Sequence, residues 1–142
     1  MKVLVSACLL GENCKYNGGS NFSPTVAEFL KGRQILPICP EVLAGMGIPR
    51  TPIEIVNGVV TDKTGRNVDA QIRHAVARIM ESLAGEEIQC AVLKSRSPTC
   101  GVRQVYDGSF SGKLIPGAGV FAQALLDAGY TVIDAEELEA NE

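Results

Sequence analysis

Apolar residues recur along the chain in short runs that are separated by polar, glycine-rich segments. Three of these runs are rich in Val, Ile and Leu and lack the strict alternation of a half-exposed strand. Such runs are typical of strands that are covered on both faces of a parallel sheet. The pattern therefore predicts three buried strands and one last strand near the end of the chain, over residues 2–7, 35–39, 88–93 and 130–133.

Helical periodicity is clearest over residues 68–83, where apolar positions repeat every three or four residues and Gly85 follows. Ser23 and Pro24 are typical of a helix start, as N-cap and first helical residue. The helix that they begin is predicted to end at Gly32. Further helices are predicted over residues 41–46 and 119–128.

Turn-forming residues define the remaining segments. The pair Asn57-Gly58 lies between apolar residues and predicts a β-hairpin over residues 53–60. Residues 9–22 are dense in Gly and Asn, which predicts a long irregular loop. Little regular structure is expected over residues 102–116, and a frayed acidic tail over residues 135–139.

The order of these elements predicts a three-layer α/β sandwich with a mostly parallel, Rossmann-like sheet and a small β-hairpin insertion. A chain of 142 residues has room for one hydrophobic core, so we expect a single domain over residues 1–142. In such sheets ligands bind beyond the carboxyl ends of the strands, and functional residues are expected there.

Charge and composition narrow the class of protein. With 13 Lys and Arg against 16 Asp and Glu, the formal net charge is −3, so no overall positive field exists to hold a nucleic acid backbone. Nucleic acid is therefore not an expected partner. The apolar runs are far shorter than the ~20 residues that cross a bilayer, and no cleavage site follows the apolar first ten residues. We expect a cytoplasmic protein with no membrane partner.

Five cysteines are unusual in a chain of this kind, because a reducing compartment favours metal binding or catalysis over disulfides. Cys8, Cys39 and Cys100 each follow or end a predicted strand, so all three are expected at the carboxyl edge of the sheet. Three converging thiolates suit an iron–sulfur cluster or zinc. The alternative is a small buried apolar residue, which is our interpretation of Cys90.

Charged residues accompany these cysteines in the sequence. Glu41 lies two residues beyond Cys39, and a carboxylate beside an open metal position can act as a general acid or base. Its alternative role is to stabilise the first turn of a short helix. Lys94, Arg50 and Arg96 are candidate contacts for a substrate phosphate, because an acidic chain must bind an anion through local cations. Solvated surface positions are the alternative for these three.

Four segments, in this order, carry a resemblance that extends over residues 3–137. They are Ser6-Ala7-Cys8-Leu9-Leu10-Gly11-Glu12-Asn13 with Tyr16-Asn17-Gly18-Gly19, Cys39-Pro40-Glu41-Val42-Leu43 with Pro49-Arg50, Lys94-Ser95-Arg96-Ser97-Pro98-Thr99-Cys100-Gly101, and Tyr106-Asp107-Gly108 with Gly112-Lys113. In these segments the chain resembles the thiouracil desulfidases, in the short form that lacks an additional C-terminal domain.

The resemblance implies a 4Fe-4S cluster on Cys8, Cys39 and Cys100, with one iron left open. Glu41 and Ser97 match the residues that are thought to move protons in that family. The open iron is then expected to bind the sulfur of a 4-thiouracil ring, which water replaces without electron transfer, leaving sulfide as the product. The expected substrate is a thiolated uracil or its nucleotide. We expect 4-thiouridine monophosphate to be preferred, because cations flank two of the cysteine loops.

Two other functions stay open at this stage. A carrier would transfer sulfide, iron or an iron–sulfur cluster to a partner without turnover, and it would need thiols but no proton-moving pair. A zinc-stabilised structural module is less favoured, because its ligands would be scattered over the core strands of a self-sufficient domain. Cys14 is a surface thiol, a loop contact or a fourth ligand, and a fourth ligand would close the site to substrate.

Overall fold

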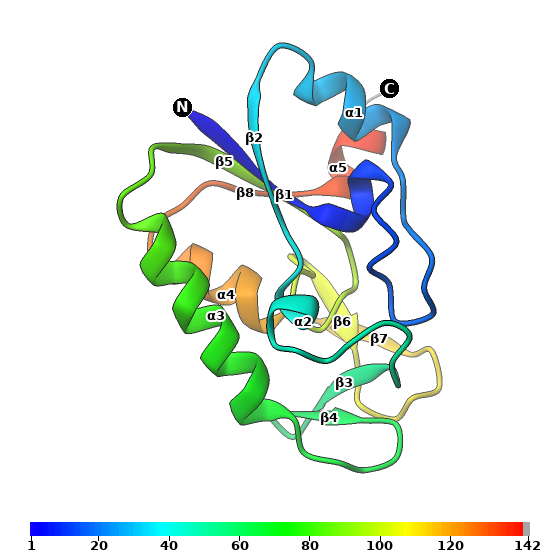
Figure 1. The fold of residues 1–142 in the computed structure, drawn as a ribbon. Coiled ribbons are helices and arrows are strands. Elements are labelled where there is room, and N and C mark those ends of the chain that lie inside the picture. The colour runs from blue at the N-terminus through cyan, green and yellow to red at the C-terminus, as the bar shows by residue number, and fades with distance from the viewer. Residues whose placement is uncertain (141–142) are drawn as a thin grey trace.

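A four-stranded parallel sheet forms the centre of the protein, whose computed structural model describes residues 1–140 (Figure 1). Neighbouring strands all run parallel, in the order β2-β1-β5-β8. This arrangement confirms the predicted, mostly parallel sheet and leaves β1 and β5 paired on both edges. The strands span Lys2–Ser6 (β1), Gln34–Ile38 (β2), Ile88–Leu93 (β5) and Val132–Asp134 (β8).

Helices cover both faces of this sheet, which confirms the predicted layers. Val3 and Val5 of β1 belong to the core beneath α1, whereas Leu4 belongs to the core beneath α3 and α4. This alternation follows from the two-residue repeat of a strand. α1 and α5 lie together on one side of the sheet in Figure 1. The helices span Pro24–Leu30 (α1), Asp69–Leu83 (α3), Val120–Asp127 (α4) and Ala135–Ala140 (α5).

Two β-hairpins lie beyond the carboxyl ends of the sheet strands (Figure 1). The first confirms the prediction from Asn57-Gly58, whose φ angles of 50° and 80° suit the tight turn. The second corrects the prediction of an irregular loop over residues 102–116. It forms because Val105 is buried and because the Asp107 amide donates to the Lys113 carbonyl at 2.9 Å. The hairpin strands span Ile53–Val56 (β3), Val59–Asp62 (β4), Gln104–Tyr106 (β6) and Leu114–Pro116 (β7).

The position of β2 corrects a second expectation. It was predicted as a buried strand, but it lies at the edge of the sheet and pairs with β1 alone. Ile35 is accordingly 41% exposed. Pro37, which has no amide hydrogen to donate, is tolerated in this strand because edge strands do not need every donor.

The predicted acidic tail is wrong, because residues 135–140 form α5. Ala135 is 1% exposed, and the Asp134 carboxylate accepts a hydrogen bond from the Glu136 amide at 2.9 Å. Glu136 and Glu137 lie in the first turn, where negative charge is favourable near the positive end of the helix dipole. Glu137 also forms an ion pair with Arg103 at 2.8 Å.

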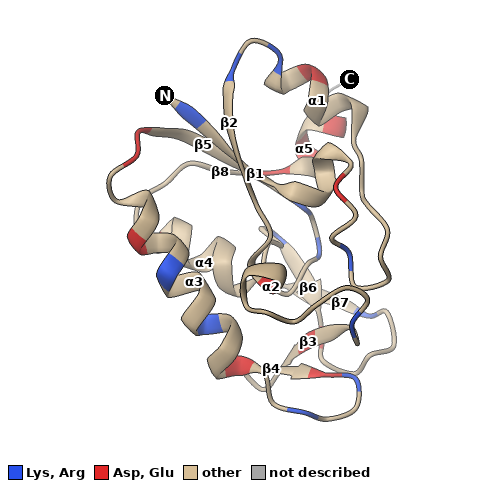
Figure 2. Cartoon of the chain, viewed as in Figure 1, with Lys and Arg blue, Asp and Glu red and all other residues tan. Residues whose placement is uncertain are grey.

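Two short helical turns begin where strands of the sheet end. The 3-10 turn η1 (Ala7–Leu10) follows β1, and α2 (Pro40–Leu43) follows β2. Acidic and basic residues are interspersed along the chain in Figure 2, in keeping with the small net charge. Within residues 1–140 no helix combines the length and the apolar composition that a membrane span requires.

Candidate functional site

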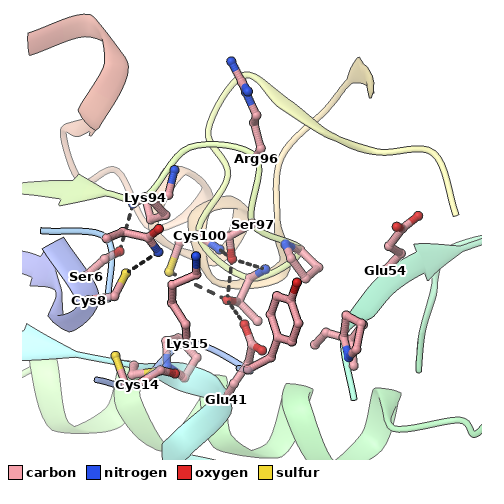
Figure 3. Close-up of a pocket in the computed structure, with 18 of the residues that line it drawn as sticks. Ser6, Cys8, Cys14, Lys15, Glu41, Glu54, Lys94, Arg96, Ser97 and Cys100 are labelled. Atoms are coloured by element: carbon pink, nitrogen blue, oxygen red, sulfur yellow. Dashed lines mark hydrogen bonds between the residues drawn. The ribbon is translucent and has the colours of Figure 1, made fainter. Parts of the chain in front are cut away.

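A cavity of about 490 Å³ opens beyond the carboxyl ends of β1, β2 and β5, where parallel α/β sheets bind ligands. Its size is that of a small-molecule site. The structure brings together at this cavity every site residue that was predicted from the sequence: Cys8, Cys39, Cys100, Glu41, Ser97, Arg50, Arg96 and Lys94. Figure 3 labels all of these except Cys39 and Arg50.

The predicted ligand thiols reach the cavity from three separate segments. Cys8 lies in η1 directly after β1, and Cys39 is the residue before the first turn of α2. Cys100 ends the loop that follows β5, and it is 4% exposed. The sheet therefore converts residues that are far apart in the sequence into neighbours at one edge.

Cys14 is a fourth thiol at this cavity. It is 7% exposed, which excludes the surface thiol among the alternatives. Burial, together with the nearby Cys39 and Cys8, raises the pKa of Cys14 to about 12. Its carbonyl oxygen also accepts a hydrogen bond from Arg50 Nη2 at 2.8 Å.

Burial likewise raises the pKa of Cys100 to about 12. It raises the pKa of Cys8 too, although a hydrogen bond from Asn21 Nδ2 at 3.4 Å opposes this effect. Without a bound cation these thiols therefore stay protonated near neutral pH. Ligation to a metal is what turns buried thiols into thiolates.

The donor set of this cavity suits an iron–sulfur cluster. Four thiols line it, and thiolates are the protein ligands that iron–sulfur clusters use. Among residues 1–140, no group of three Cys, His, Asp or Glu side chains is placed to hold a metal ion.

Glu41 and Arg50 form a buried ion pair at this cavity. Arg50 Nε lies 3.2 Å from Glu41 Oε1, and the two side chains are only 6% and 15% exposed. Arg50 also donates from Nη1 to the carbonyl of Gly47 at 3.0 Å, and its amide donates to the carbonyl of Tyr16 at 2.6 Å. With the bond to Cys14 described above, Arg50 ties three segments together and has a structural task besides any contact with substrate.

The second oxygen of Glu41 ends a chain of hydroxyl groups (Figure 3). Thr99 Oγ1 lies 3.3 Å from Glu41 Oε2 and 3.0 Å from Ser97 Oγ. Ser97 Oγ accepts hydrogen bonds from the amides of Thr99 and Cys100, at 3.1 and 3.0 Å. These bonds occupy both of its lone pairs, so the Ser97 hydroxyl must donate to Thr99, which in turn donates to the carboxylate.

Two glycines allow the segment around Thr99 and Cys100 to pack tightly. A Cβ on Gly101 would lie 2.7 Å from the Ser97 carbonyl oxygen, and one on Gly119 would lie 2.5 Å from the carbonyl carbon of Thr99. A side chain at either position would push the segment away. The amide of Phe121 in α4 donates to the Thr99 carbonyl at 2.8 Å, which anchors the segment further.

The predicted phosphate contacts differ in how much of their charge is already paired. Arg96 forms an ion pair with Glu136 at 3.0 Å, and its side chain points away from the cysteines in Figure 3. Lys94 Nζ donates to Ser95 Oγ at 3.2 Å. Lys15 and Lys63 also line the cavity, and neither forms an ion pair with the described residues.

Sequence reasoning missed these two lysines and Thr99. Lys15 lies one residue beyond Cys14 in the long glycine-rich loop, which was a signal that could have been used. Lys63 belongs to the turn after β4 and carried no such signal. Thr99 was visible only as a member of the segment around Cys100, because its partner Glu41 is 58 residues away.

Four thiols and a hydrogen-bonded carboxylate at the carboxyl edge of a parallel sheet define a site of the kind that parallel α/β enzymes use for ligands. Comparison with known proteins identifies the family. The family model of the 2-thiouracil desulfurases matches residues 3–137, and the chain belongs to this family.

Individual relatives agree over nearly the whole chain. YbbK, an uncharacterized protein of Bacillus subtilis strain 168, is 38% identical over 146 residues, which covers 96% of this chain and 97% of YbbK. Among solved structures, the [4Fe-4S]-dependent thiouracil desulfidase TudS superposes with a TM-score of 0.88 at 32% sequence identity. That match covers 98% of this chain and 93% of TudS.

Removing the buried guanidinium should destabilise the protein strongly. We expect Arg50→Ala to lower the free energy of unfolding by about 3–5 kcal/mol, because it leaves the largely buried Glu41 carboxylate without an opposite charge. Urea denaturation of the cluster-free protein measures this loss. Arg96→Ala is the control, since its half-exposed ion pair should contribute at most about 1 kcal/mol. Equal losses in the two variants would contradict a structural task for Arg50.

Proposed function

We propose that this protein is an iron–sulfur-dependent desulfidase that removes the sulfur of thiolated uracil compounds by hydrolysis. Cys8, Cys39 and Cys100 would hold a 4Fe-4S cluster. The related TudS is named a [4Fe-4S]-dependent desulfidase, which supports this type of cluster. Cys14 is left outside the ligand set, so that one iron stays open to substrate. Glu41 and Ser97 would move protons.

The observation that carries this proposal is the buried chain from Ser97 through Thr99 to Glu41, which lies at the same cavity as the thiols. A carrier of sulfide, iron or a cluster needs thiols but gains nothing from a hydroxyl chain that ends on a carboxylate. Enclosing such polar groups costs free energy, and buried polar networks are favourable only when every member is satisfied. The network therefore favours catalysis over the carrier alternative.

Hydrolysis of a thiocarbonyl adds the oxygen of water to carbon and releases the sulfur with two protons, as hydrogen sulfide or as the hydrosulfide ion and a free proton. Atoms and charge balance, and no electron is transferred. When bound, the cluster supplies a soft Lewis acid for the soft sulfur of the substrate. The chain itself must take protons from water and return protons to the leaving group.

The hydroxyl chain has the direction that this task requires. A water must first displace one of the two amide donors from Ser97 Oγ. It then gives a proton to Ser97, Ser97 passes its own proton to Thr99, and Thr99 passes its proton to Glu41. The amide donor that remains stabilises negative charge on Ser97 Oγ during this transfer. Arg50 holds the other carboxylate oxygen of Glu41 in place.

Substrate preference follows from the cations of the cavity. Arg50 is engaged by Glu41 and Arg96 by Glu136, so Lys94, Lys15 and Lys63 are the charges best able to meet a phosphate. A thiolated uracil nucleotide such as 4-thiouridine monophosphate would place its phosphate among these lysines. Phosphate binding at this rim would hold the ring near the thiols and lower the barrier as well as KM.

Replacing single cysteines should show which thiols bind the cluster and which do not. Anaerobic reconstitution of the parent protein is expected to give about four iron and four sulfide per chain. Cys8→Ala, Cys39→Ala and Cys100→Ala should each lose this content, and Cys14→Ala should retain it. Iron and acid-labile sulfide analysis measures the outcome. A cluster that survives in one of the first three variants but not in Cys14→Ala would contradict the ligand assignment.

Interrupting the hydroxyl chain should lower turnover without loss of the cluster. Glu41→Gln is expected to lower kcat by about 10²–10⁴-fold, the usual contribution of a positioned base. Thr99→Val, which keeps the shape but removes the hydroxyl, should lower kcat in the same way, and Thr99→Ser should restore it. Sulfide release is measured at matched iron content. Equal rates in Thr99→Val and the parent would exclude the chain as a proton path.

The phosphate contacts are tested by comparing substrates. We expect kcat/KM to rise from 4-thiouracil to 4-thiouridine to its monophosphate. Each of the variants Lys15→Ala, Lys63→Ala and Lys94→Ala should lower kcat/KM for the monophosphate by about 10–150-fold and so reduce the difference between the substrates. Lys31→Ala is the control, because Lys31 pairs with Glu28 away from the cavity. 2-Thiouracil reports on which ring position is attacked. If the parent treats the three 4-thio compounds alike, the phosphate site does not exist.

A further inference from the structure

Glu54 is a buried carboxylate that the proposed mechanism does not use. It lies in β3, lines the cavity and is 8% exposed, yet it forms no ion pair within residues 1–140. Its Oε1 accepts hydrogen bonds from the amides of Gly108 and Phe110, at 2.9 and 3.1 Å. Placing a charge in this position is costly unless it is hydrogen-bonded, so its partners indicate its task. Glu54 holds the loop between β6 and β7.

The loop that Glu54 holds has an unusual backbone. Phe110 has a φ angle of 56°, in the left-handed region, where a bulky residue is rare. Gly108 has a φ of 94°, and a Cβ there would lie 2.7 Å from the Ile55 carbonyl oxygen. The loop therefore packs directly on the backbone of β3. Strain of this kind persists only where surrounding contacts enforce it, and it is concentrated at functional sites.

The strained residue belongs to an aromatic lining. Phe110, Tyr106 and Tyr16 all line the cavity, although the whole chain has only four Phe, three Tyr and no Trp. Phe121 fills the core instead, where it is fully buried. Aromatic rings beside a cavity offer flat faces on which a planar heterocycle stacks, whatever its exact hydrogen-bonding pattern.

We propose that Phe110 is the stacking wall for the pyrimidine ring of the substrate and that Glu54 is the positioning residue that holds Phe110 there. This inference rests on the proposed function for the identity of the ring, but the wall itself is defined by the loop geometry. Glu54 acts only through the two amides of the loop. The Glu54 carboxylate thereby sets the orientation of the substrate from the side of the cavity opposite the cysteines in Figure 3.

The test compares variants that remove the aromatic face with variants that release the loop. Phe110→Leu keeps apolar bulk but has no flat face, and Phe110→Tyr keeps the face. Glu54→Ala and Gly108→Ala both free the loop, one by removing its acceptor and the other by adding a Cβ. The first measurement is KM and kcat for sulfide release from 4-thiouridine. The second is the dissociation constant of uridine monophosphate, which has no sulfur to lose, by isothermal titration of the cluster-loaded protein.

We expect Phe110→Leu and Glu54→Ala to weaken uridine monophosphate binding and to raise KM by about 5–150-fold, the range for loss of one base-stacking contact. Gly108→Ala should do the same, and Phe110→Tyr should bind like the parent. Glu54→Gln, which keeps an oxygen acceptor, should lie between the parent and Glu54→Ala. If Glu54→Ala fails to fold, Phe110→Leu and Glu54→Gln decide the question.

Two matched controls distinguish the loss of the stacking contact from a general destabilisation of the protein. Asp69→Ala removes another carboxylate that accepts a backbone amide of the same hairpin, that of Val60, and Asp69 does not line the cavity. Phe22→Leu removes an aromatic residue that is 55% exposed and does not line the cavity. Both should bind uridine monophosphate like the parent.

The outcomes distinguish the two proposals. If the parent releases sulfide but Phe110→Leu and Glu54→Ala leave both KM and the dissociation constant unchanged, the stacking wall is wrong and the proposed function stands. If the parent releases no sulfide but binds uridine monophosphate in a manner that depends on Phe110 and Glu54, the stacking wall stands without the activity. A parent that neither releases sulfide nor binds the nucleotide overturns both.

Discussion

The guanidinium of Arg50 is the constraint on which the cavity depends. A charged group that is almost fully enclosed must have each of its donors matched, or the cost of removing it from water is not recovered. Here the matching acceptors come from Glu41 and from backbone carbonyls of two loops. These loops form no helix or strand beside the cavity, so the hydrogen bonds of Arg50 hold them in place instead of the backbone hydrogen bonds of a regular element. The loop side of the cavity is thereby fixed by three hydrogen bonds of one side chain.

Parallel strands explain how such a site is assembled from distant parts of the chain. Each strand of the sheet delivers the residue after its carboxyl end to the same edge, whatever the length of the crossover that follows. Cys8 and Cys100 are far apart in the sequence, but they lie at the same cavity because β1 and β5 are neighbours in the sheet. The hairpins are added beyond this edge and close the remaining side. The thiols thus lie on the sheet side of the cavity, whereas Tyr106 and Phe110 line it from the β6–β7 hairpin.

The sequence predicted those parts of the molecule in which local signals and tertiary packing agree. The strands through Val5 and Val92 and the helix that Ser23 caps were found because their apolar pattern and capping chemistry are local. β6, β7 and α5 were missed because contacts from distant residues stabilise them, as the pair of Arg103 with Glu137 illustrates. The common location of the predicted ligand thiols at the cavity was predictable because each thiol follows or ends a predicted parallel strand. The direction of the hydroxyl chain was not, because it depends on backbone amides that the sequence does not reveal.

Under the proposed function, the high pKa of Cys100 has a consequence for the protein before a cluster is inserted. Oxidants and electrophiles attack the thiolate, so a thiol that stays protonated is chemically quiet. A newly synthesised chain can therefore persist with its buried thiols intact until maturation. Loading of the proposed cluster would expel protons from the interior, because each thiol ligand must ionise as it binds. The burial that keeps the thiols protonated would therefore make insertion of the proposed cluster easier as the pH rises.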